Sequence, residues 1–379
     1  MDFELTSEQL ALQETSRRFA REEVAPVAAH HDQSGEFPRQ IIEKAWELGL
    51  LNTVVPEEYG GLGLSSVDAC VITEEIAWGC AGISTSICCN DLALTPIVVA
   101  GSESQKREWL TPFTERFTLA AFCLTEPEAG SDVAGLQLRA RKEGDEYVLD
   151  GTKCWITNGG ESSLFTVFAT LDRSLKHEGI CAFIVPADAP GIEVGKKEDK
   201  MGQRASDTRV IHFDGARVPA AQRIGAEGEG FKIAMRTLDR ARPPIAAQAT
   251  GIAQRALDES VTYARERKAF GSPIGAFQAV QFMLADMGKD VEASRLLTLQ
   301  SAWMVDRGLQ ASKNSSMAKC FATDSAMRAS TDAVQIFGGN GYSKEYPVEK
   351  LMRDAKLMQI YEGTNQIQRL VIARDLLKG

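Results

Sequence analysis

The feature that most constrains the fold of this 379-residue chain is a succession of three long helical segments in its C-terminal part. Apolar residues recur at three- and four-residue spacing over about Phe231–Arg267, Phe277–Arg307 and Lys313–Phe337. Helices this long, joined by short connections, pack against one another as an antiparallel bundle. The pair Pro243-Pro244 either kinks the first helix or marks its true beginning. We therefore expect a helical bundle over residues 229–379.

The N-terminal part of the chain has the same periodicity and shows no strand pattern. Its expected helices cover about Thr6–His31, Pro38–Leu50, Ser66–Gly79, Ile83–Ala100 and Ser104–Phe113. The first helix opens on a sequence, Thr6 to Gln9, that fits a capping box, in which two side chains satisfy free backbone N–H groups. We expect an all-α domain over residues 1–118.

Between these helical parts lie short β-prone runs separated by Gly and Pro. The runs are Ala120–Thr125, Phe165–Thr170, Cys181–Val185, Ile192–Val194 and Val210–Asp214. Asp150-Gly151 also stands between two β-prone runs and predicts a tight hairpin turn. We expect a small β domain over residues 119–228, so the predicted fold class is α+β, mainly α.

Composition and charge exclude several classes of function. A net charge of −10 argues against nucleic-acid binding, which requires a basic surface. No apolar run approaches the length of a membrane span, so we expect no membrane insertion. The eight cysteines form no C-x-x-C pair and the four histidines lack metal-ligand spacing, which indicates reduced thiols and no metal site. The acidic N-terminus predicts a cytoplasmic bacterial protein, or a mitochondrial matrix protein after processing.

Near the C-terminus, one carboxylate is placed between an aromatic residue and a glycine. Glu362 follows Tyr361 and precedes Gly363, in a turn with mostly apolar residues before it. A helix is expected directly afterwards, with Thr364 as its N-cap. A helix N-terminus favours anions, and an apolar setting raises a carboxyl pKa toward the range useful to a general base. A loop glutamate facing water is the alternative, and this stretch taken alone favours it.

Three further segments carry residues suited to holding a ligand. Gly130-Ser131 follows an X-Pro turn and can present N–H and hydroxyl groups, although a plain strand-to-turn connection is an equal alternative. Trp155 is expected in the core of the β domain, with stacking beside a planar cofactor as the second interpretation. Gln335–Tyr342 ends a long helix with glycines that form a C-cap or let a ligand approach the backbone closely. The usual nucleotide-binding and serine-hydrolase motifs are missing from the sequence.

Five segments of the chain resemble the signature sequences of acyl-CoA dehydrogenases. They are Glu126–Asp132, Asp150–Asn158, Arg267–Gly271, Gln335–Gly341 and Ile360–Thr364. The resemblance covers essentially the whole chain and implies the family's fold, with an N-terminal helical domain, a middle β domain and a C-terminal four-helix bundle. Within the family, the sequence is most similar to the medium-chain enzyme, through Arg21–Pro26, Ala45–Leu50 and Tyr346–Ala355.

The resemblance implies an FAD-dependent α,β-dehydrogenation of a fatty acyl-CoA to a trans-2-enoyl-CoA, as in fatty acid β-oxidation. Glu362 matches the family's catalytic base, which removes the α-proton while the β-hydrogen leaves as hydride to the flavin N5. The thioester oxygen is expected to accept from the backbone N–H of Glu362 and from a flavin ribityl hydroxyl. Some branches carry the base at the position aligned with Ala241, which cannot accept a proton here.

The resemblance also carries over contact residues. Those matching FAD positions are Phe122, Leu124, Thr125, Gly130, Ser131, Trp155, Ile156, Thr157, Arg267, Phe270, Gln278, Gln335, Gly338, Gly339, Thr364 and Gln366. Those matching acyl-CoA positions are Ser131, Asp239, Arg242, Tyr361, Glu362 and Gly363. The FAD positions from Arg267 to Gly339 belong to a part of the site shared across a subunit interface, which implies a homotetramer built as a dimer of dimers. Ala269 stands where the family often has Thr, so one polar contact is missing.

Substrate chain length and electron acceptor stay open at this point. The medium-chain resemblance favours a medium-chain acyl-CoA, with a tail pocket lined by Ser84–Asp91 and Leu92–Thr95. The small Cys88 and Cys89 can deepen that pocket. Electron-transferring flavoprotein is the implied partner, with Glu198 aligned to a position used in that encounter, although a solvated charge run is an equal interpretation. An acyl-CoA oxidase or flavin monooxygenase, and a non-catalytic acyl-CoA-binding protein, are the alternatives.

Overall fold

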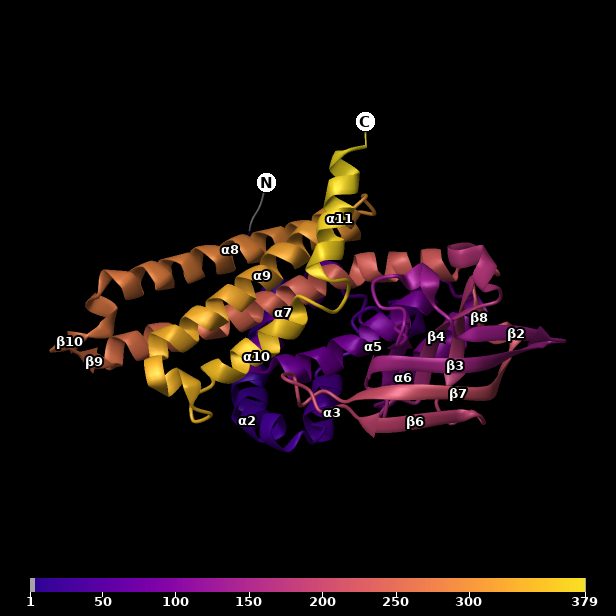
Figure 1. The fold of residues 1–379 in the computed structure, drawn as a ribbon, viewed down its shortest axis with the longest axis horizontal. Coiled ribbons are helices and arrows are strands. Elements are labelled where there is room, and N and C mark those ends of the chain that lie inside the picture. Colours follow the sequence, from indigo (N-terminus) through magenta and orange to yellow (C-terminus); the bar gives the residue numbers. More distant parts are fainter. Residues whose placement is uncertain (1–3, 379) are drawn as a thin grey trace.

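The computed structural model describes residues 4–378 and has the predicted order of a helical part, a sheet part and a second helical part (Figure 1). The fold class, α+β and mainly α, is confirmed. Residues 1–3 and 379, which we assigned to the ends of the first and last domains, lie outside the described residues. We propose to divide the chain at 118/119 and 228/229, which fall between α6 and β1 and between β8 and α7.

Among the described residues, the first part consists of six α-helices, three of which begin at a Ser or Thr cap in a capping box. They are α1 (Ser7–Phe19), α2 (Ala25–Ser34), α3 (Arg39–Glu47), α4 (Ser66–Gly79), α5 (Ala81–Ala100) and α6 (Glu103–Glu115). The predicted capping box is confirmed, since the Gln9 N–H donates to Thr6 Oγ1 over 3.2 Å. The single helix expected up to His31 instead contains a π-helical turn over Ala20–Val24 between α1 and α2. It ends at Ser34, before Gly35 in the left-handed region.

The second part is an eight-stranded sheet. Its strands are β1 (Ala120–Cys123), β2 (Arg139–Glu143), β3 (Glu146–Thr157), β4 (Leu164–Thr170), β5 (Ile180–Pro186), β6 (Ile192–Lys197), β7 (Thr208–Pro219) and β8 (Arg223–Ile224). The order is β6-β7-β3-β2-β4-β5-β8, with β1 pairing parallel to β4. β4 and β5 are buried almost throughout, so the sheet is covered on both faces.

The hairpin predicted at Asp150-Gly151 is wrong. β3 runs straight through these residues, and the turn lies earlier, at Gly144-Asp145, where Glu143 pairs with Glu146. Gly144 has φ +61°, which suits a two-residue hairpin loop. Gly151 instead lies at an irregularity in the pairing with β7, with φ +144°, and a Cβ there would come 2.9 Å from Leu138 Cα. The glycine therefore serves close packing and not a turn.

The third part is the predicted bundle. Its helices are α7 (Gly230–Glu266), α8 (Gln278–Asp306), α9 (Ser312–Phe337), α10 (Val348–Met358) and α11 (Asn365–Leu376), with the short pair β9 (Lys268–Ala269) and β10 (Ser272–Pro273) at its far end. α7, α8 and α9 run along the long axis of the molecule (Figure 1). α7 continues through Pro243 and Pro244, so these prolines do not mark its beginning.

Helix α5 lies between the bundle and the sheet. The Gln248 side chain of α7 donates to the Ala81 carbonyl over 2.9 Å, and the Ala120 N–H of β1 donates to Asn90 Oδ1 over 2.9 Å. α5 is the one described helix long and apolar enough to cross a membrane, but 67% of its most apolar window is buried inside the protein. It is therefore placed as a core helix that touches all three parts.

Candidate active site

The loop that carries Glu362 lies between α10 and α11 and has an unusual backbone. Glu362 has φ +56° and Gly363 has φ +89°. A left-handed conformation is uncommon for a residue with a side chain and needs support from its surroundings. Thr364 is the N-cap of α11, as predicted, because the Ile367 N–H donates to its hydroxyl over 3.3 Å.

The chain after this loop folds back to hold it. The Gln368 side-chain amide donates to the carbonyl of Gly363 over 2.9 Å and to that of Glu362 over 3.2 Å. A Cβ at position 363 would come 2.6 Å from that same amide nitrogen and would displace it, and the positive φ favours glycine there. The Asn365 N–H donates to the Gln359 carbonyl over 3.0 Å and closes the turn. The strained backbone is thus fixed from several sides.

The Glu362 carboxyl is buried and poorly paired. Its Oε2 atom has no hydrogen-bond partner among the described residues. Burial raises the pKa of Glu362 to about 7, although the charges of Arg242 and Lys319 pull it down. The interpretation that this is a loop glutamate facing water is therefore wrong. A buried carboxyl that titrates near neutrality suits a general base.

Arg242, in the first half of α7, lies close enough to this carboxyl for its charge to act on it. Its residue surface is only 4% exposed, it pairs with Asp239 one turn earlier, and Nε has no partner among the described residues. Burial lowers the pKa of Arg242, and the charges of Asp239 and Glu362 act in the opposite direction. Arg242 is therefore a buried charge and not an exposed charge on the helix surface. A buried guanidinium with a free N–H is suited to meeting an anionic or polar group.

Tyr361 is anchored by a directional chain of hydrogen bonds. Its hydroxyl donates to Gln248 Oε1 over 2.8 Å. The Gln248 amide donates to the Thr85 hydroxyl over 2.6 Å, and that hydroxyl donates to Gln203 Oε1 over 2.6 Å. Burial raises the pKa of Tyr361, which keeps the phenol neutral. Thr85 lies on α5, Gln203 in the sheet part and Gln248 on α7. This series of hydrogen bonds therefore joins all three parts of the protein beside Glu362.

The segment of α5 predicted to line the acyl tail lies at the same place. Cys89 Sγ lies 3.4 Å from the Thr157 carbonyl oxygen at the end of β3. Burial raises the pKa of Cys88 to about 12, and the charge of Glu362 adds to that increase. The thiols are therefore neutral. The eight cysteines form no pair, and all but Cys88 are buried.

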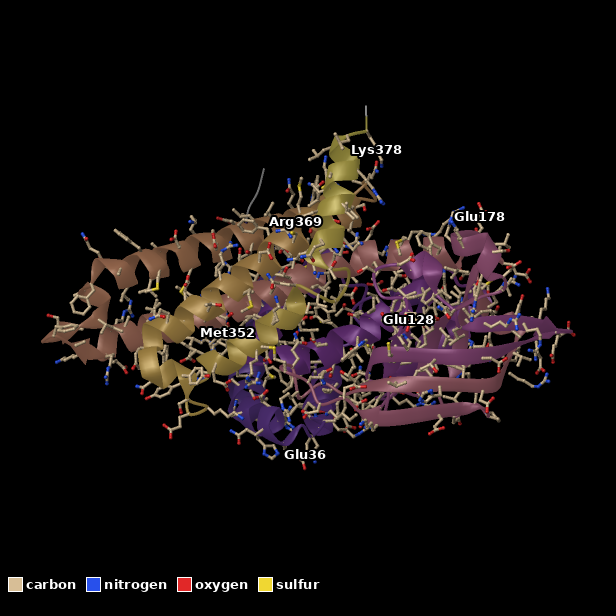
Figure 2. The ribbon with its side chains drawn as sticks, in the orientation of Figure 1. Glu36, Glu128, Glu178, Met352, Arg369 and Lys378 are labelled. Atoms are coloured by element: carbon tan, nitrogen blue, oxygen red, sulfur yellow. The ribbon has the colours of Figure 1, made fainter. Side chains whose placement is uncertain are left out.

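The predicted FAD residues of the sheet part gather at its edge facing the helices. Trp155 is 61% exposed and has φ +59°, so the interpretation as a core residue is wrong. Ile156 is buried in the sheet core, so only its backbone is available to a ligand. Gly130 and Ser131 are exposed, and Glu128 marks their loop between sheet and bundle (Figure 2).

A buried ion pair supports this edge. Lys153 of β3 is fully buried, and its Nζ donates to Glu126 Oε1 over 2.7 Å and to the Leu124 carbonyl over 2.9 Å. The same carboxylate accepts from the Leu138 N–H over 2.9 Å. The Cys154 N–H donates to the Thr125 carbonyl over 2.9 Å. These bonds fix the backbone directly after β1, where the predicted FAD residues Leu124 and Thr125 follow Phe122 of that strand.

The remaining predicted FAD residues form a second group that the chain does not bring to Glu362. These exposed residues are Arg267, Phe270, Gln278, Gln335, Gly338 and Gly339. They lie around β9, β10 and the end of α9, at the far end of the bundle from the sheet (Figure 1). Phe270 is 98% exposed with φ +51°, and the predicted C-cap at Gly338 has φ +60°. The two groups of predicted FAD residues therefore lie at separate places in the chain.

Both groups fit the FAD implied by the resemblance. The exposed indole of Trp155 offers a flat face to a ring system, and the exposed Ser131 hydroxyl offers a polar contact. A Cβ added at Gly338 or Gly339 meets no atom within 4 Å, so that backbone is open to a neighbour. The exposed guanidinium of Arg267 is suited to a phosphate.

Several supporting residues were missed from the sequence. They are Lys153, Gln203, Gln248, Lys319 and Gln368. For Lys319 a signal existed, because it shares a helical face with small residues at spacings of three and four, which predicts a buried position. Lys153, Gln203 and Gln248 have partners far away in sequence, and no local pattern identifies these. Gln368 bonds to carbonyls five and six residues earlier, but no helical or strand periodicity relates it to that loop.

Three family models match the chain in order. They are the N-terminal domain of acyl-CoA dehydrogenase over residues 6–116, its middle domain over residues 121–216 and its C-terminal domain over residues 228–377. A probable acyl-CoA dehydrogenase of Bacillus subtilis, YngJ, is 47% identical over 100% of both chains. A probable medium-chain specific enzyme of Caenorhabditis briggsae is 46% identical and the short-chain specific enzyme of Rattus norvegicus 47%. These matches cover 100% and 99% of this chain and 92% of each relative.

Solved structures agree with these relatives. Butyryl-CoA dehydrogenase from Megasphaera elsdenii superposes with a TM-score of 0.97 at 42% identity, over 100% of both chains. A chain from work on the electron transferring flavoprotein of Acidaminococcus fermentans superposes with a TM-score of 0.98 at 45% identity, again over 100% of both. The helical, sheet and bundle parts described above are therefore the three domains of a known fold. The chain belongs to the acyl-CoA dehydrogenase family of FAD-dependent oxidoreductases.

Proposed function

We propose that this flavin-dependent acyl-CoA dehydrogenase forms a trans-2-enoyl-CoA from a fatty acyl-CoA, with Glu362 as the base. The observation that carries the proposal is the buried, unpartnered carboxyl oxygen of Glu362 on a fixed, left-handed loop beside Arg242 and Lys319. Ala241, at the alternative position for a base in the family, has no group that accepts a proton. Glu362 is therefore the residue assigned to the first proton transfer.

In the proposed mechanism, Glu362 removes the proton from the α-carbon of the thioester. A pKa of about 7 leaves the carboxylate ionised over part of the physiological range, and desolvation makes it more basic than an exposed glutamate. FAD, when bound, would supply the acceptor for the hydride that leaves the β-carbon. Arg242 and Lys319 stabilise the carboxylate before transfer, and the apolar surroundings favour the neutral acid afterwards.

The backbone of the same residue is suited to the thioester oxygen. No described residue accepts a hydrogen bond from the Glu362 N–H. A fixed N–H stabilises negative charge that develops on a carbonyl oxygen while the α-proton leaves. Because one residue supplies both the base and this donor, the proton and the oxygen are held in a fixed relation by the loop.

The proposed acyl group is of medium chain length. Relatives named as medium-chain and as short-chain enzymes are equally similar to this chain, so identity does not distinguish them. The support comes from α5, where the small Cys88 and Cys89 lie near enough to Glu362 for its charge to act on both thiols. The short-chain alternative is kept because the butyryl-CoA dehydrogenase structure is also a full-length match.

The proposed partners are a second copy of the chain and electron-transferring flavoprotein. The exposed second FAD group supports a homotetramer in which a neighbour completes the site, as the family resemblance implies. One full-length structural match comes from work on an electron transferring flavoprotein. Glu198 is half-exposed beside Lys200, whose Nζ donates to the Ser206 carbonyl over 2.7 Å, so the surrounding charge run is partly ordered.

The test is the visible spectrum of the purified holoenzyme without oxygen. Acyl-CoAs from C4 to C16 are added, and the loss of flavin absorbance gives both activity and chain-length preference. We expect bleaching with an optimum among medium chains. A sharp optimum at C4 contradicts the chain-length proposal only. Rapid reoxidation of the bleached enzyme by air would indicate an oxidase instead, and a protein that stays colourless after FAD addition would indicate a non-catalytic role.

A further inference from the structure

We propose that Lys319 of α9 is a positioning residue, which holds the Glu362 loop in its left-handed conformation and keeps the Glu362 carboxylate ionised. The proposal rests on the proposed role of Glu362 as the base, and it adds a second residue that acts through Glu362 without contacting the reacting atoms. It starts from a fully buried lysine, which is rare unless the ammonium group has specific partners.

The ammonium group is directed at the loop. Lys319 Nζ donates to the Gly363 carbonyl over 2.9 Å and to Asn365 Oδ1 over 2.9 Å. Gly363 follows the base directly, and Asn365 is the first residue of α11. One side chain of the bundle therefore ties together the residue after the base and the start of the next helix.

The second partner of Lys319 is itself fixed by the same helix. The Asn365 side-chain amide donates to Thr323 Oγ1 over 2.8 Å and to Asp324 Oδ1 over 2.7 Å. Asp324 also accepts from Arg369 over 2.7 Å, and Figure 2 labels Arg369 beside α11. Lys319 is thus the inner end of a set of contacts that docks α11 on α9. The loop cannot shift without breaking them.

The backbone of Glu362 needs such support. A left-handed conformation costs a residue with a side chain roughly 1 kcal/mol or more. Two side chains donate to the backbone carbonyls of this loop. Gln368 donates to the carbonyls of Glu362 and Gly363, and Lys319 donates to that of Gly363. Of these two donors, only Lys319 carries a charge.

The charges around the base give Lys319 a distinct role. Glu362 faces Arg242 from α7 and Lys319 from α9, while Cys88 and Cys89 approach from α5 as neutral thiols. Arg242 is paired with the Asp239 carboxylate, which offsets its charge. Both hydrogen-bond acceptors of Lys319 are neutral oxygens. The positive charge of Lys319 therefore acts on Glu362 with no carboxylate bonded to it.

Burial of the ammonium group also changes the pKa of Lys319. Burial lowers the pKa of Lys319 to about 8, and the charges of Glu362, Cys320 and Asp324 raise it while that of Arg242 lowers it. The charge state of Lys319 therefore depends on the ionisation of Glu362, because both hydrogen-bond partners of the lysine are neutral. Loss of the lysine charge therefore makes the glutamate harder to ionise.

The test compares two variants of the holoenzyme with a control on the same helix. Lys319→Met removes both the charge and the donor, whereas Lys319→Gln removes the charge and keeps an N–H donor. Lys313→Met is the control, because Lys313 also reaches from α9 to α11, where its Nζ lies 3.2 Å from Asp375 Oδ1, but does not contact the Glu362 loop. FAD content and acyl-CoA binding are measured for all three.

The first readout is the pH dependence of flavin reduction by acyl-CoA. We expect its midpoint to move to higher pH by about one unit or more in both Lys319 variants, so that the rate at pH 6 falls about tenfold. The plateau at high pH falls further in Lys319→Met than in Lys319→Gln, because only the methionine variant also loses the bond to Gly363. Lys313→Met keeps the wild-type profile. A wild-type midpoint in either Lys319 variant overturns the proposal.

The second readout needs no turnover and separates this proposal from the proposed function. Glu362→Gln is introduced into the wild-type protein and into the Lys319→Gln variant. The melting temperatures of all four proteins are measured at pH 5 and pH 8. We expect the stabilisation by Glu362→Gln at pH 8 relative to pH 5 to be larger by about 1–2 °C in the Lys319→Gln background. Equal values in the two backgrounds overturn the proposal even if the enzyme fails to bleach with any acyl-CoA. If Lys319→Met does not fold, Lys319→Gln alone decides both readouts.

Discussion

Replacing Glu362 by Gln should stabilise the protein in a pH-dependent way. Burial raises the pKa of Glu362 from 4.5 to about 7, so the folded chain binds this proton more tightly than the unfolded chain. The wild-type chain therefore loses stability as pH rises from about 4.5 through about 7, because ionisation is easier after unfolding. Integrated between pH 5 and pH 8, the loss is about 2.5 kcal/mol per subunit. The glutamine amide carries no charge and escapes this loss.

The assay is thermal unfolding of the wild type and Glu362→Gln at both pH values. At pH 5 the two side chains are both neutral in the folded state. The difference in melting temperature at pH 5 therefore reports only the replacement of a carboxylic acid by an amide. The additional stabilisation at pH 8 isolates the buried charge and corresponds to about 3 °C for a chain of this length. Glu178→Gln is the matched control, since Glu178 has a side chain that is 76% exposed at the outer edge of the sheet domain (Figure 2).

The result that refutes this reasoning is equally specific. If Glu362→Gln shifts the melting temperature by the same amount at pH 5 and pH 8, the carboxyl is not held in a desolvated site. A shift in Glu178→Gln that matches the shift in Glu362→Gln would show that any loss of negative charge has the same effect. In either case, the proposed basicity of Glu362 loses its physical cause.

Three other substitutions give separate outcomes. Gly363→Ala places a Cβ 2.6 Å from the Gln368 amide at φ +89°, so rapid-mixing measurements should show flavin reduction slowed by at least about tenfold at unchanged FAD content. Tyr361→Phe leaves the buried Gln248 Oε1 without its donor and should lower the free energy of unfolding by about 1 kcal/mol in a denaturant titration. Lys153→Met leaves the Glu126 carboxylate buried and unpaired, which should cost about 3–5 kcal/mol and reduce the FAD content of the purified protein.

The sequence was sufficient to predict the elements whose patterns are local. The long bundle helices follow from apolar spacing, and the ends at Thr6 and Thr364 follow from capping chemistry, because both depend on residues within a few positions. The prediction of a hairpin at Asp150-Gly151 was wrong because a position can require glycine for two reasons, a turn or close packing. At Gly151 the reason is the close approach of Leu138. The prediction that Trp155 lies in the core was wrong because the sequence does not distinguish a buried indole from an exposed one.

The candidate site could be predicted only in part, for a related reason. Glu362 was identified through the family resemblance, whereas its burial depends on helices from three distant parts of the chain. Gln203 and Gln248 bond to Thr85 across 118 and 163 positions. Such long-range polar partners leave no periodic signal in the sequence. The structure therefore contributes the surroundings of Glu362, whereas the resemblance contributes its proposed role.

The central claim is that Glu362 starts the reaction, and one spectrum tests it most directly. Purified Glu362→Gln holoenzyme is mixed with octanoyl-CoA without oxygen, and the flavin absorbance is followed beside the wild type. We predict that the variant retains FAD and shows the small spectral change of acyl-CoA binding, but that its flavin is not bleached while that of the wild type is. Bleaching of the variant at the wild-type rate would contradict the assignment of Glu362 as the base.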